Sequence, residues 1–394
     1  MSSGSTTGIL PGYTQNNRVR LIHGGKEYFD RLKEIIDHAR ESIHLQVYIY
    51  ADDATGKQVA DALIAAAGRG VAVYLLADGY ASQHLSSSFI RRLQQSGIHF
   101  RFFEPVFRSR HYYFGRRLHH KLMVADGLYA LAGGINISNS YNDMPGHPAW
   151  LDFALYLEGD AAKDLCVLCW KTWYGFPSPV DDTPCQANPA LLNIQPEEAC
   201  LVRMRRNDWV RGRNQVSKSY LEIFSQATSQ LIVVSSYFLP GRVFRKNLYA
   251  AVERGVKVKL VLAGVSDVML AKQAERYIYR RLLRKNIEIY EYRRSVLHGK
   301  LAICDDSWMT LGSYNVNNIS AFASIELNLD VNNPVFTASV RQGIEEIIEN
   351  DCTRVTEKSF YRRNHYLLRL WQETCYGFIR VLLFLFTFYF RREK

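Results

Sequence analysis

A motif of histidine, lysine and aspartate occurs twice in this chain, at the same internal spacing. Each copy fits His-x-Lys-x4-Asp, and a small-residue turn that ends in asparagine follows at the same distance. The residues are His119, Lys121, Asp126 and Asn136 in the first copy, and His298, Lys300, Asp305 and Asn315 in the second. Two matched sets of this kind predict one composite site that is built from two similar halves.

The similarity extends upstream of both motifs. Residues 67–73 resemble residues 252–258, and each of these segments leads from a helical pattern into an apolar strand. Strand-like runs at 43–50 and 231–238 come before them. A repeat of this length indicates a duplicated domain rather than a solenoid. Because helical patterns alternate with apolar strands, we expect an α/β fold of two similar sandwich lobes, each with a parallel or mixed sheet.

The chain of 394 residues has room for two such lobes, each with its own core. Prolines concentrate between residues 176 and 199, where they break regular structure. No secretory segment is visible near the N-terminus. We therefore expect a disordered leader at 1–17, a first lobe at 18–175, a linker at 176–199, a second lobe at 200–356 and a tail at 357–394.

The seven cysteines show no disulfide framework, which favours a reducing compartment. Cys166 and Cys169 form a single Cys-x2-Cys pair, and Cys185 and Cys200 do not supply a second one. A zinc site with four ligands is therefore not predicted. Both residues of the pair fall in a helical pattern, so we expect them to be buried thiols.

The paired motifs suit attack on a phosphodiester. A neutral imidazole can serve as the nucleophile, and a second, protonated imidazole can give a proton to the leaving alkoxide. The lysines, together with Asn136 and Asn315, would offset the charge that develops on the phosphate oxygens. This scheme requires no metal, and we expect no cofactor. A single His-x-Lys would more simply indicate a surface or core histidine without a catalytic role. Two copies in register favour a catalytic site.

The spacing also decides which histidine of the first copy belongs to the site. Alternate residues of a strand share a face, so His119 points with Lys121, and His298 points with Lys300. His120 is expected to be a bystander, since a glycine takes its place in the second copy.

Four carboxylates accompany the motifs. Asp126 and Asp305 complete the motif and belong to the predicted catalytic set, although their position after the strand favours capping of a turn. Asp152 and Glu326 open the strands that follow the two motifs. Each histidine needs an acceptor for its second nitrogen, and we predict that Asp152 and Glu326 supply it. The alternative for either residue alone is a solvated carboxylate at a strand end.

These residues resemble the phospholipase D superfamily, and the resemblance covers nearly the whole chain except the leader and the tail. The segments that carry it are Gly133–Ile137, Trp150-x-Asp152, Gly312-Ser313-x-Asn315 and Glu326-x-Asn328. They are most similar to the shorter bacterial cardiolipin synthases, which lack N-terminal transmembrane helices. The resemblance implies a site at the lobe interface and a phosphohistidine intermediate, with His119 as nucleophile and His298 as acid and base. One departure is that residues 315–320 read Asn-Val-Asn-Asn-Ile-Ser, where many members carry Asp-x-Arg-Ser.

The tail contains an apolar run at 381–390 with arginines on both sides. A spanning helix needs about 20 apolar residues, so this run is too short. An aromatic, apolar segment flanked by arginines predicts an interfacial membrane contact. The alternative is a terminal helix that packs on the protein's own core or on a second subunit.

The net charge of +11 suits an anionic partner, either lipid or nucleic acid. Residues 101–117 mix arginines with aromatics before the first motif. They could meet lipid headgroups, stack on bases or form a solvated basic loop.

The leading hypothesis is a phosphatidyltransferase that converts two molecules of phosphatidylglycerol into cardiolipin and glycerol. Its partners would be phosphatidylglycerol and the membrane surface, without nucleic acid, at the cytoplasmic face of a bacterial inner membrane, either peripheral or attached by the tail. A phospholipid hydrolase would use the same residues with water as acceptor. A nuclease of the superfamily is disfavoured by the tail, and a membrane scaffold without activity is disfavoured by the two intact motifs.

Overall fold

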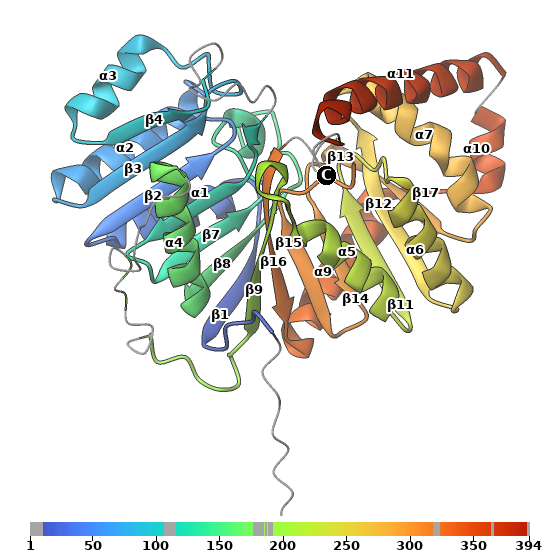
Figure 1. Cartoon of the computed structure of the whole chain (residues 1–394), viewed down its shortest axis with the longest axis horizontal. Coiled ribbons are helices and arrows are strands. Elements are labelled where there is room, and N and C mark those ends of the chain that lie inside the picture. The colour runs from blue at the N-terminus through green and yellow to red at the C-terminus, as the bar shows by residue number, and fades with distance from the viewer. Residues whose placement is uncertain are drawn as a thin grey trace, which may run out of the picture.

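Two similar α/β lobes lie side by side in the computed structural model (Figure 1). The structure describes residues 11–105, 116–175, 185, 187, 192–317, 324–363 and 366–391. The predicted class, a pair of duplicated α/β lobes, is confirmed.

The first lobe is built on a seven-stranded mixed sheet. In spatial order its strands are β1 (Asn17–His23), β8 (Phe153–Gly159), β7 (Tyr129–Gly133), β6 (Lys121–Ala125), β2 (Ser42–Val47), β3 (Ala72–Asp78) and β4 (His99–Phe103). Strands β2, β3 and β4 are parallel to one another, and β6 runs antiparallel to β2. The helices are α1 (Lys26–His38), α2 (Ala54–Gly68), α3 (Ser87–Gln95) and α4 (Asp160–Tyr174). Helices α1, α2 and α3 cover one face, and α4 packs on the other.

The second lobe repeats this plan with a ten-stranded sheet. Its strands in spatial order are β10 (Arg213–Asn214), β9 (Leu201–Asp208), β16 (Ser324–Asn332), β15 (Trp308–Gly312), β14 (Leu301–Cys304), β11 (Gln230–Ser235), β12 (Lys257–Val265), β13 (Glu288–Val296) and β17 (Cys352–Val355), while β5 (Arg117–Leu118) pairs with β16. The helices are α5 (Gln215–Gln226), α6 (Arg242–Glu253), α7 (Met269–Leu283), α9 (Pro334–Asp351), α10 (Glu357–Arg363) and α11 (Tyr366–Arg391). The short 3-10 helix η3 (Trp209–Arg211) belongs to this lobe, and η1 (Asn139–Tyr141) belongs to the first lobe.

A hydrophobic core runs from one lobe into the other. Leu122 and Leu157 of the first sheet share it with Leu311 and Leu329 of the second, and α4 and α9 close its sides. These side chains alternate along their strands with residues that face the outer helices, as the period of a strand requires. The shared core fixes the two lobes against each other.

The chain enters the first lobe earlier than the sequence predicted. Residues 1–10 of the expected leader lie outside the described residues, but Thr14 forms an antiparallel bridge to Val202 in β9. Asn17 is fully buried, where its side chain donates to the Cys200 carbonyl and accepts from the Ala161 amide. The prediction of a disordered leader is therefore wrong for residues 11–17, because their backbone joins the two lobes.

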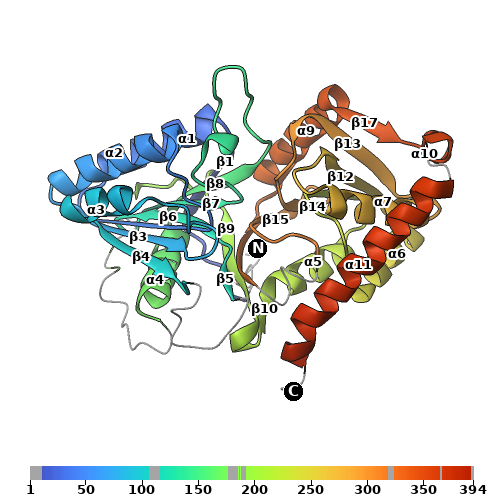
Figure 2. The same cartoon turned by 90° about the horizontal axis from the view of Figure 1, so that it is seen from above.

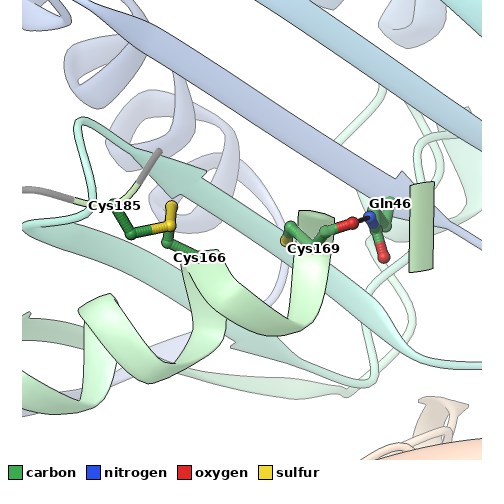
Figure 3. Close-up of a disulfide and its surroundings, with 4 residues drawn as sticks. All are labelled: Gln46, Cys166, Cys169 and Cys185. Carbon is green, nitrogen blue, oxygen red and sulfur yellow. Dashed lines mark hydrogen bonds between the residues drawn. A yellow bond between two sulfur atoms is a disulfide. The ribbon is translucent and has the colours of Figure 1, made fainter. Parts of the chain in front are cut away.

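The expectation that the chain lacks disulfides is also wrong. Cys166 on α4 is bonded to Cys185, with their Cα atoms 6.1 Å apart, and Cys169 lies one turn further along the helix (Figure 3). The helical pattern correctly placed Cys166 and Cys169 in the core, and Cys169 is a buried free thiol. Cys185 lies in the proline-rich segment, 19 residues beyond its partner, where no periodic pattern marks it.

The last helix, α11, crosses the second lobe against α7 (Figure 2). Tyr376 stacks on Tyr277 at 4.8 Å between ring centroids, and Gln372 and Cys375 are buried in the contact. Within the described part of the chain, no helix has the length and apolar character that crossing a bilayer requires.

Candidate active site

Two short parallel pairings bring the motifs together across the lobe boundary. Strand β5 pairs with the start of β16, and Leu151 forms the matching bridge to Leu297. As a result, the His119 amide donates to the carbonyl of Ile325, and the His298 amide donates to that of Leu151. His119 is therefore next to the residue before Glu326, and His298 is next to the residue before Asp152, so each histidine lies near a carboxylate of the other lobe.

His119 is held by Glu326. Its Nδ1 lies 2.9 Å from Oε2 of Glu326, a residue that is fully buried and that also accepts a hydrogen bond from Ser313 Oγ. Burial opposes ionisation of Glu326, but His119 and Lys121 outweigh it and hold the pKa of the carboxyl below its usual range. Burial also lowers the pKa of His119, although Glu326 opposes this shift. Since Nδ1 faces the carboxylate, Nε2 is the nitrogen that can attack phosphorus.

His298 is held in the same way by Asp152. Its Nδ1 lies 2.6 Å from Oδ2 of Asp152, and the backbone amide of Phe153 donates to the other carboxylate oxygen. Burial, followed by the nearby charge of Lys300, lowers the pKa of His298 to about 4. A Cβ atom at Gly134 would come within 2.3 Å of Asp152, so the close approach of strand and carboxylate requires glycine there.

The structure thus brings the four predicted residues His119, Glu326, His298 and Asp152 into one place, but it exchanges the carboxylates between the lobes. The sequence identified one carboxylate on the strand after each motif. Its spacing carried no sign that each carboxylate serves the histidine of the other half.

Both motif lysines are buried beside their histidines. Lys121 Nζ donates to the carbonyl of His119, and Lys300 Nζ donates to the carbonyl of His298 and lies 2.9 Å from its Nδ1. Burial lowers the pKa of Lys121 to about 7 and that of Lys300 to about 8, against an ordinary value of 10.5. A bound phosphate anion would favour the charged form of both amines.

The two asparagines have different surroundings. Asn136 accepts a hydrogen bond from the Ile49 amide and donates to the hydroxyl of Tyr141, which lies 3.3 Å from Nε2 of His298. Asn136 therefore reaches the site through Tyr141. Asn315 is buried and accepts from the Ser236 hydroxyl.

The motif aspartates lie at the opposite ends of their strands from the histidines. Asp126 accepts from the backbone amides of residues 40–42, and Asp305 accepts from those of residues 228–230. These bonds tie the end of each motif strand to the start of its neighbour. Their inclusion in the catalytic set is corrected accordingly, and the capping role that their position favoured is the one the geometry shows.

Sequence reasoning missed three residues of the site. Tyr141 lies against His298, Ser313 holds Glu326, and the ring of Tyr48 lies 4.7 Å from that of His119. Two of them could have been predicted as site residues from their positions. Ser313 belongs to the turn that ends in Asn315, and Tyr141 follows Asn136 by five residues. Tyr48 carried no such signal, because it follows β2, far from either motif in sequence. His120, the expected bystander, points elsewhere, and its Nε2 meets Gln46.

Within the described residues, no three His, Cys, Asp or Glu side chains are grouped as metal ligands. Only part of the predicted arginine-rich and aromatic-rich segment at 101–117 can be placed, since residues 106–115 lie outside the described chain. Arg101 lies over the ring of Trp173, and Arg117 is 3.7 Å from Asp78.

Comparisons with known proteins agree with this geometry. A family model described as "Cardiolipin synthase, PLD-like domain" matches residues 32–145 and 220–348. Cardiolipin synthase B of Escherichia coli (strain K12) is 33% identical over 354 residues, which are 89% of this chain and 85% of the relative. A cardiolipin synthase of Halalkalibacterium halodurans is 27% identical over 365 residues, or 91% of this chain and 71% of the relative. The chain therefore belongs to the cardiolipin synthase-like family of the phospholipase D superfamily, and the predicted family and enzyme class are confirmed.

A solved structure supports the fold independently. The crystal structure of phosphatidylserine synthase from Haemophilus influenzae Rd KW20 superposes with a TM-score of 0.71, at 14% sequence identity. The match covers 92% of this chain and 93% of that one, so both lobes share the arrangement.

Proposed function

We propose that this chain is a cardiolipin synthase-type phosphatidyltransferase that joins two phosphatidylglycerol molecules and releases glycerol. The observation that carries the proposal is the reciprocal pair of imidazoles, each held through Nδ1 by a buried carboxylate of the other lobe. The related proteins are named cardiolipin synthases, and these names supply the lipid class of the product. The hydrolase, which uses the same residues with water as acceptor, becomes an outcome of the test.

In the first step, Nε2 of His119 attacks the phosphorus of one phosphatidylglycerol. The bond from phosphorus to the glycerol oxygen breaks, and the imidazolium of His298 gives its proton to that oxygen. Glu326 stabilises the positive charge that the ring of His119 acquires. Lys121 and Lys300 offset the negative charge on the phosphate oxygens.

In the second step, the hydroxyl of another phosphatidylglycerol attacks the phosphohistidine. The neutral ring of His298 takes the hydroxyl proton, the phosphorus–nitrogen bond to His119 breaks, and cardiolipin is formed. His298 must therefore be protonated before the first step and neutral before the second. Its depressed pKa suits the second state, and the anionic phosphate of a bound lipid raises the pKa towards the first.

The final helix supplies a surface for the membrane. Opposite its contact with α7, α11 presents a stripe of apolar side chains that are each more than half exposed: Leu367, Leu370, Trp371, Phe378 and Val381. We infer that this exposed stripe lies in the headgroup layer of an anionic bilayer, parallel to its surface. We propose a peripheral position on the cytoplasmic face of a bacterial inner membrane, although disulfides such as the bond between Cys166 and Cys185 are more common in oxidising compartments.

The position of α11 fits this role. His298 precedes β14, which runs antiparallel to β11, so His298 lies at the end towards which β11 runs. In Figure 1, α11 lies along the rim of the second lobe at that same end. A bilayer beneath the stripe would therefore meet the end of the lobe that carries the site.

The test is incubation of the purified full chain with phosphatidylglycerol vesicles in the presence of EDTA, followed by analysis of the lipids. Cardiolipin and equimolar glycerol support the proposal, and the variant His119→Ala should form neither. Phosphatidic acid in place of cardiolipin would identify a hydrolase instead. Cleavage of nucleic acid without turnover of lipid would identify a nuclease. Loss of activity in EDTA that zinc or magnesium restores would contradict the metal-independent mechanism.

A further inference from the structure

A pocket lies at the boundary between the lobes, one side chain away from His298. Its volume is about 640 Å³. This is enough for an organic ligand, since ligand pockets commonly measure about 300–1,000 Å³. The walls come from both lobes and include Pro148, Trp150, Val265, Arg294 and Val296. We call this cavity the His298 pocket.

Three apolar side chains form a row along one wall of the pocket. Val265 at the end of β12 pairs with Val296 at the end of β13. The chain just before Asp152 bonds to the carbonyl of Val296, which places Trp150 next in the row. Because alternate residues of a strand share a face, Val296 points with His298, and Trp150 points with Asp152. The row therefore lies on the face of the strands that carries the catalytic groups.

Trp150 separates the pocket from His298. The centroid of its ring lies 6.0 Å from that of His298 and 5.2 Å from that of Tyr141. The hydroxyl of Ser295 donates to the carbonyl of Ala149, which ties the loop before Trp150 to β13. Trp150 is partly exposed, so a ligand that reaches His298 can extend past its ring into the pocket.

The duplication does not repeat this apolar row beside His119. In the other half, the residues at the matching distances from the repeated segments are Tyr80, Arg117 and Ser324. The guanidinium of Arg117 lies over the ring of Tyr80, 5.5 Å from its centroid, so a row exists there as well, but it is polar. The two histidines have matching carboxylate and lysine partners but different side chains beside them. The two sides of the site are therefore suited to different parts of the substrates.

We propose that the His298 pocket binds the acceptor of the second step, which is the glycerol headgroup of another anionic phospholipid together with the start of its apolar part. This inference rests on the proposed function and deepens it. The acceptor hydroxyl bonds to phosphorus, its proton passes to Nε2 of His298, and the bond from phosphorus to His119 breaks. In an in-line displacement the entering oxygen lies opposite His119, so the rest of the acceptor lies on the His298 side. An apolar wall there favours an alcohol that carries a lipid over water or glycerol.

The charge at the rim of the pocket fits an anionic acceptor. The side chain of Arg294 is 70% exposed, and its guanidinium is 4.0 Å from Asp351, a long distance for an ion pair. Exposed pairs of this kind contribute little to stability, so Arg294 can contact a lipid phosphate at small cost. Val265 lies at the same end of the second lobe as His298, because β12 runs parallel to β11. The exposed stripe of α11 is at that end too, so one bilayer can supply the acceptor.

The experiment compares two acceptors for the same phosphohistidine. Vesicles of phosphatidylglycerol are incubated with the full chain in the presence of ethanol, so that cardiolipin and phosphatidylethanol form in competition. Val265→Trp and Pro148→Trp each place an indole in the pocket, one from each lobe, so the ratio of cardiolipin to phosphatidylethanol should fall about tenfold. Val268→Trp is the matched control. Val268 is 44% exposed, against 45% for Val265, but it does not line the pocket, and its ratio should equal that of the wild type.

Arg294→Gln tests the charge separately from the apolar wall. Its ratio of cardiolipin to phosphatidylethanol should fall about threefold at low salt, because an exposed charged contact to the acceptor phosphate is lost. An unchanged ratio would contradict the position of the acceptor phosphate at this rim.

The outcomes separate this inference from the proposed function. If the wild type forms cardiolipin and both tryptophan variants keep its ratio, the pocket does not bind the acceptor. Equal loss of both products in the two variants also contradicts the inference, since ethanol does not need the pocket. If the wild type forms phosphatidylethanol or phosphatidic acid without cardiolipin, the proposed function fails and the acceptor pocket fails with it.

Discussion

The hydroxyl of Tyr141 lies 3.3 Å from Nε2 of His298, on the far side of the ring from Asp152. Asn136 donates to the same hydroxyl, so the tyrosine proton is left to point at His298. A donor at Nε2 stabilises the neutral ring whose Nδ1 proton faces Asp152. Tyr141 therefore helps to set the proton affinity of the predicted acid and base.

Tyr141→Phe should raise the pKa of His298, because the neutral ring loses a hydrogen-bond donor. One hydrogen bond of about 1 kcal/mol corresponds to a shift of about 0.7 pH unit. The alkaline limb of the pH–rate profile should move upward by about this amount, although its apparent pKa belongs to the pair of histidines. Tyr156→Phe, whose hydroxyl bonds Glu158, serves as control and should leave the limb in place. An unmoved limb in Tyr141→Phe would contradict the role.

His119→Ala should abolish turnover, since no nucleophile remains, and the wild type should carry a phosphatidyl adduct on His119. His298→Asn should let the adduct accumulate, because the acceptor hydroxyl loses its base. Mass spectrometry of acid-quenched protein locates the adduct. His147→Ala, which removes an exposed histidine, should behave as the wild type does. An adduct on His298 in the wild type would reverse the two assignments.

Glu326→Gln should slow formation of the phosphohistidine, although Glu326 belongs to the other lobe. The amide keeps the shape of the side chain but cannot stabilise the developing charge on His119. Asp152→Asn should act in the same way on His298. We expect losses of about 10²- to 10⁴-fold in single-turnover rate for each variant. Glu345→Gln, which disrupts an ion pair with Lys259, is the control. If both site variants lose less than about threefold in rate, the contact of each histidine with the carboxylate of the other lobe is not needed for activity.

The buried lysines predict proton uptake on binding of an anion. At pH 8 to 9, Lys121 and Lys300 are largely or partly neutral, and a phosphate analogue such as tungstate should raise both pKa values. Calorimetry in buffers of different ionisation enthalpy should detect uptake of about one proton. Lys300→Met should reduce the uptake, and unchanged uptake would contradict the assignment.

The same shifts give the direction of the stability change with pH. Both lysines have folded pKa values below their unfolded value of 10.5, so the unfolded chain binds more protons from about pH 7 upward. Their contribution to the free energy of unfolding should rise with pH across this window, up to about pH 10.5.

Trp371→Glu and Phe378→Glu should weaken vesicle binding while the fold is retained, because both side chains lie on the exposed stripe of α11. Burying each such side chain is worth about 1.5–3 kcal/mol, which salt does not screen, so binding of the wild type should survive moderate salt. Cosedimentation with anionic vesicles measures both effects. Val243→Glu, on the exposed part of α6, is the control. Equal binding by all variants would place the membrane contact elsewhere. Truncation near Lys358 is a coarser test, because it also removes the contact of Tyr376 with Tyr277.

The sequence predicted the two lobes, and it predicted which histidines and carboxylates lie together in the structure, because these signals are local. A strand between His119 and Asp126, and its copy after His298, can be read from adjacent residues, and duplication makes the match visible twice. The exchange of carboxylates could not be read in this way. It depends on β5 pairing with β16, between segments 207 residues apart, and no spacing within one lobe encodes it.

Two further differences have the same origin. The bond between Cys166 and Cys185 joins a helix to a segment without periodic pattern, so composition alone suggested free thiols. The sequence offered a membrane contact and a packed helix as alternatives for the tail. In the structure, one face of α11 packs on α7 and the opposite, apolar face is exposed. The two alternatives are therefore compatible, since each concerns a different face of the same helix.

The reciprocal pairing also constrains how such a chain can change. A hybrid made from the first lobe of this protein and the second lobe of a relative would inherit a histidine from one parent and its carboxylate from the other. The shorter Asp152 lies against Gly134, where the Cβ atom of any other residue would collide with its carboxylate. The longer Glu326 accepts a hydrogen bond from the hydroxyl of Ser313. A substitution near the carboxylate of one lobe therefore changes the surroundings of the histidine in the other lobe. We expect substitutions around the site in one lobe to require compensating substitutions in the other.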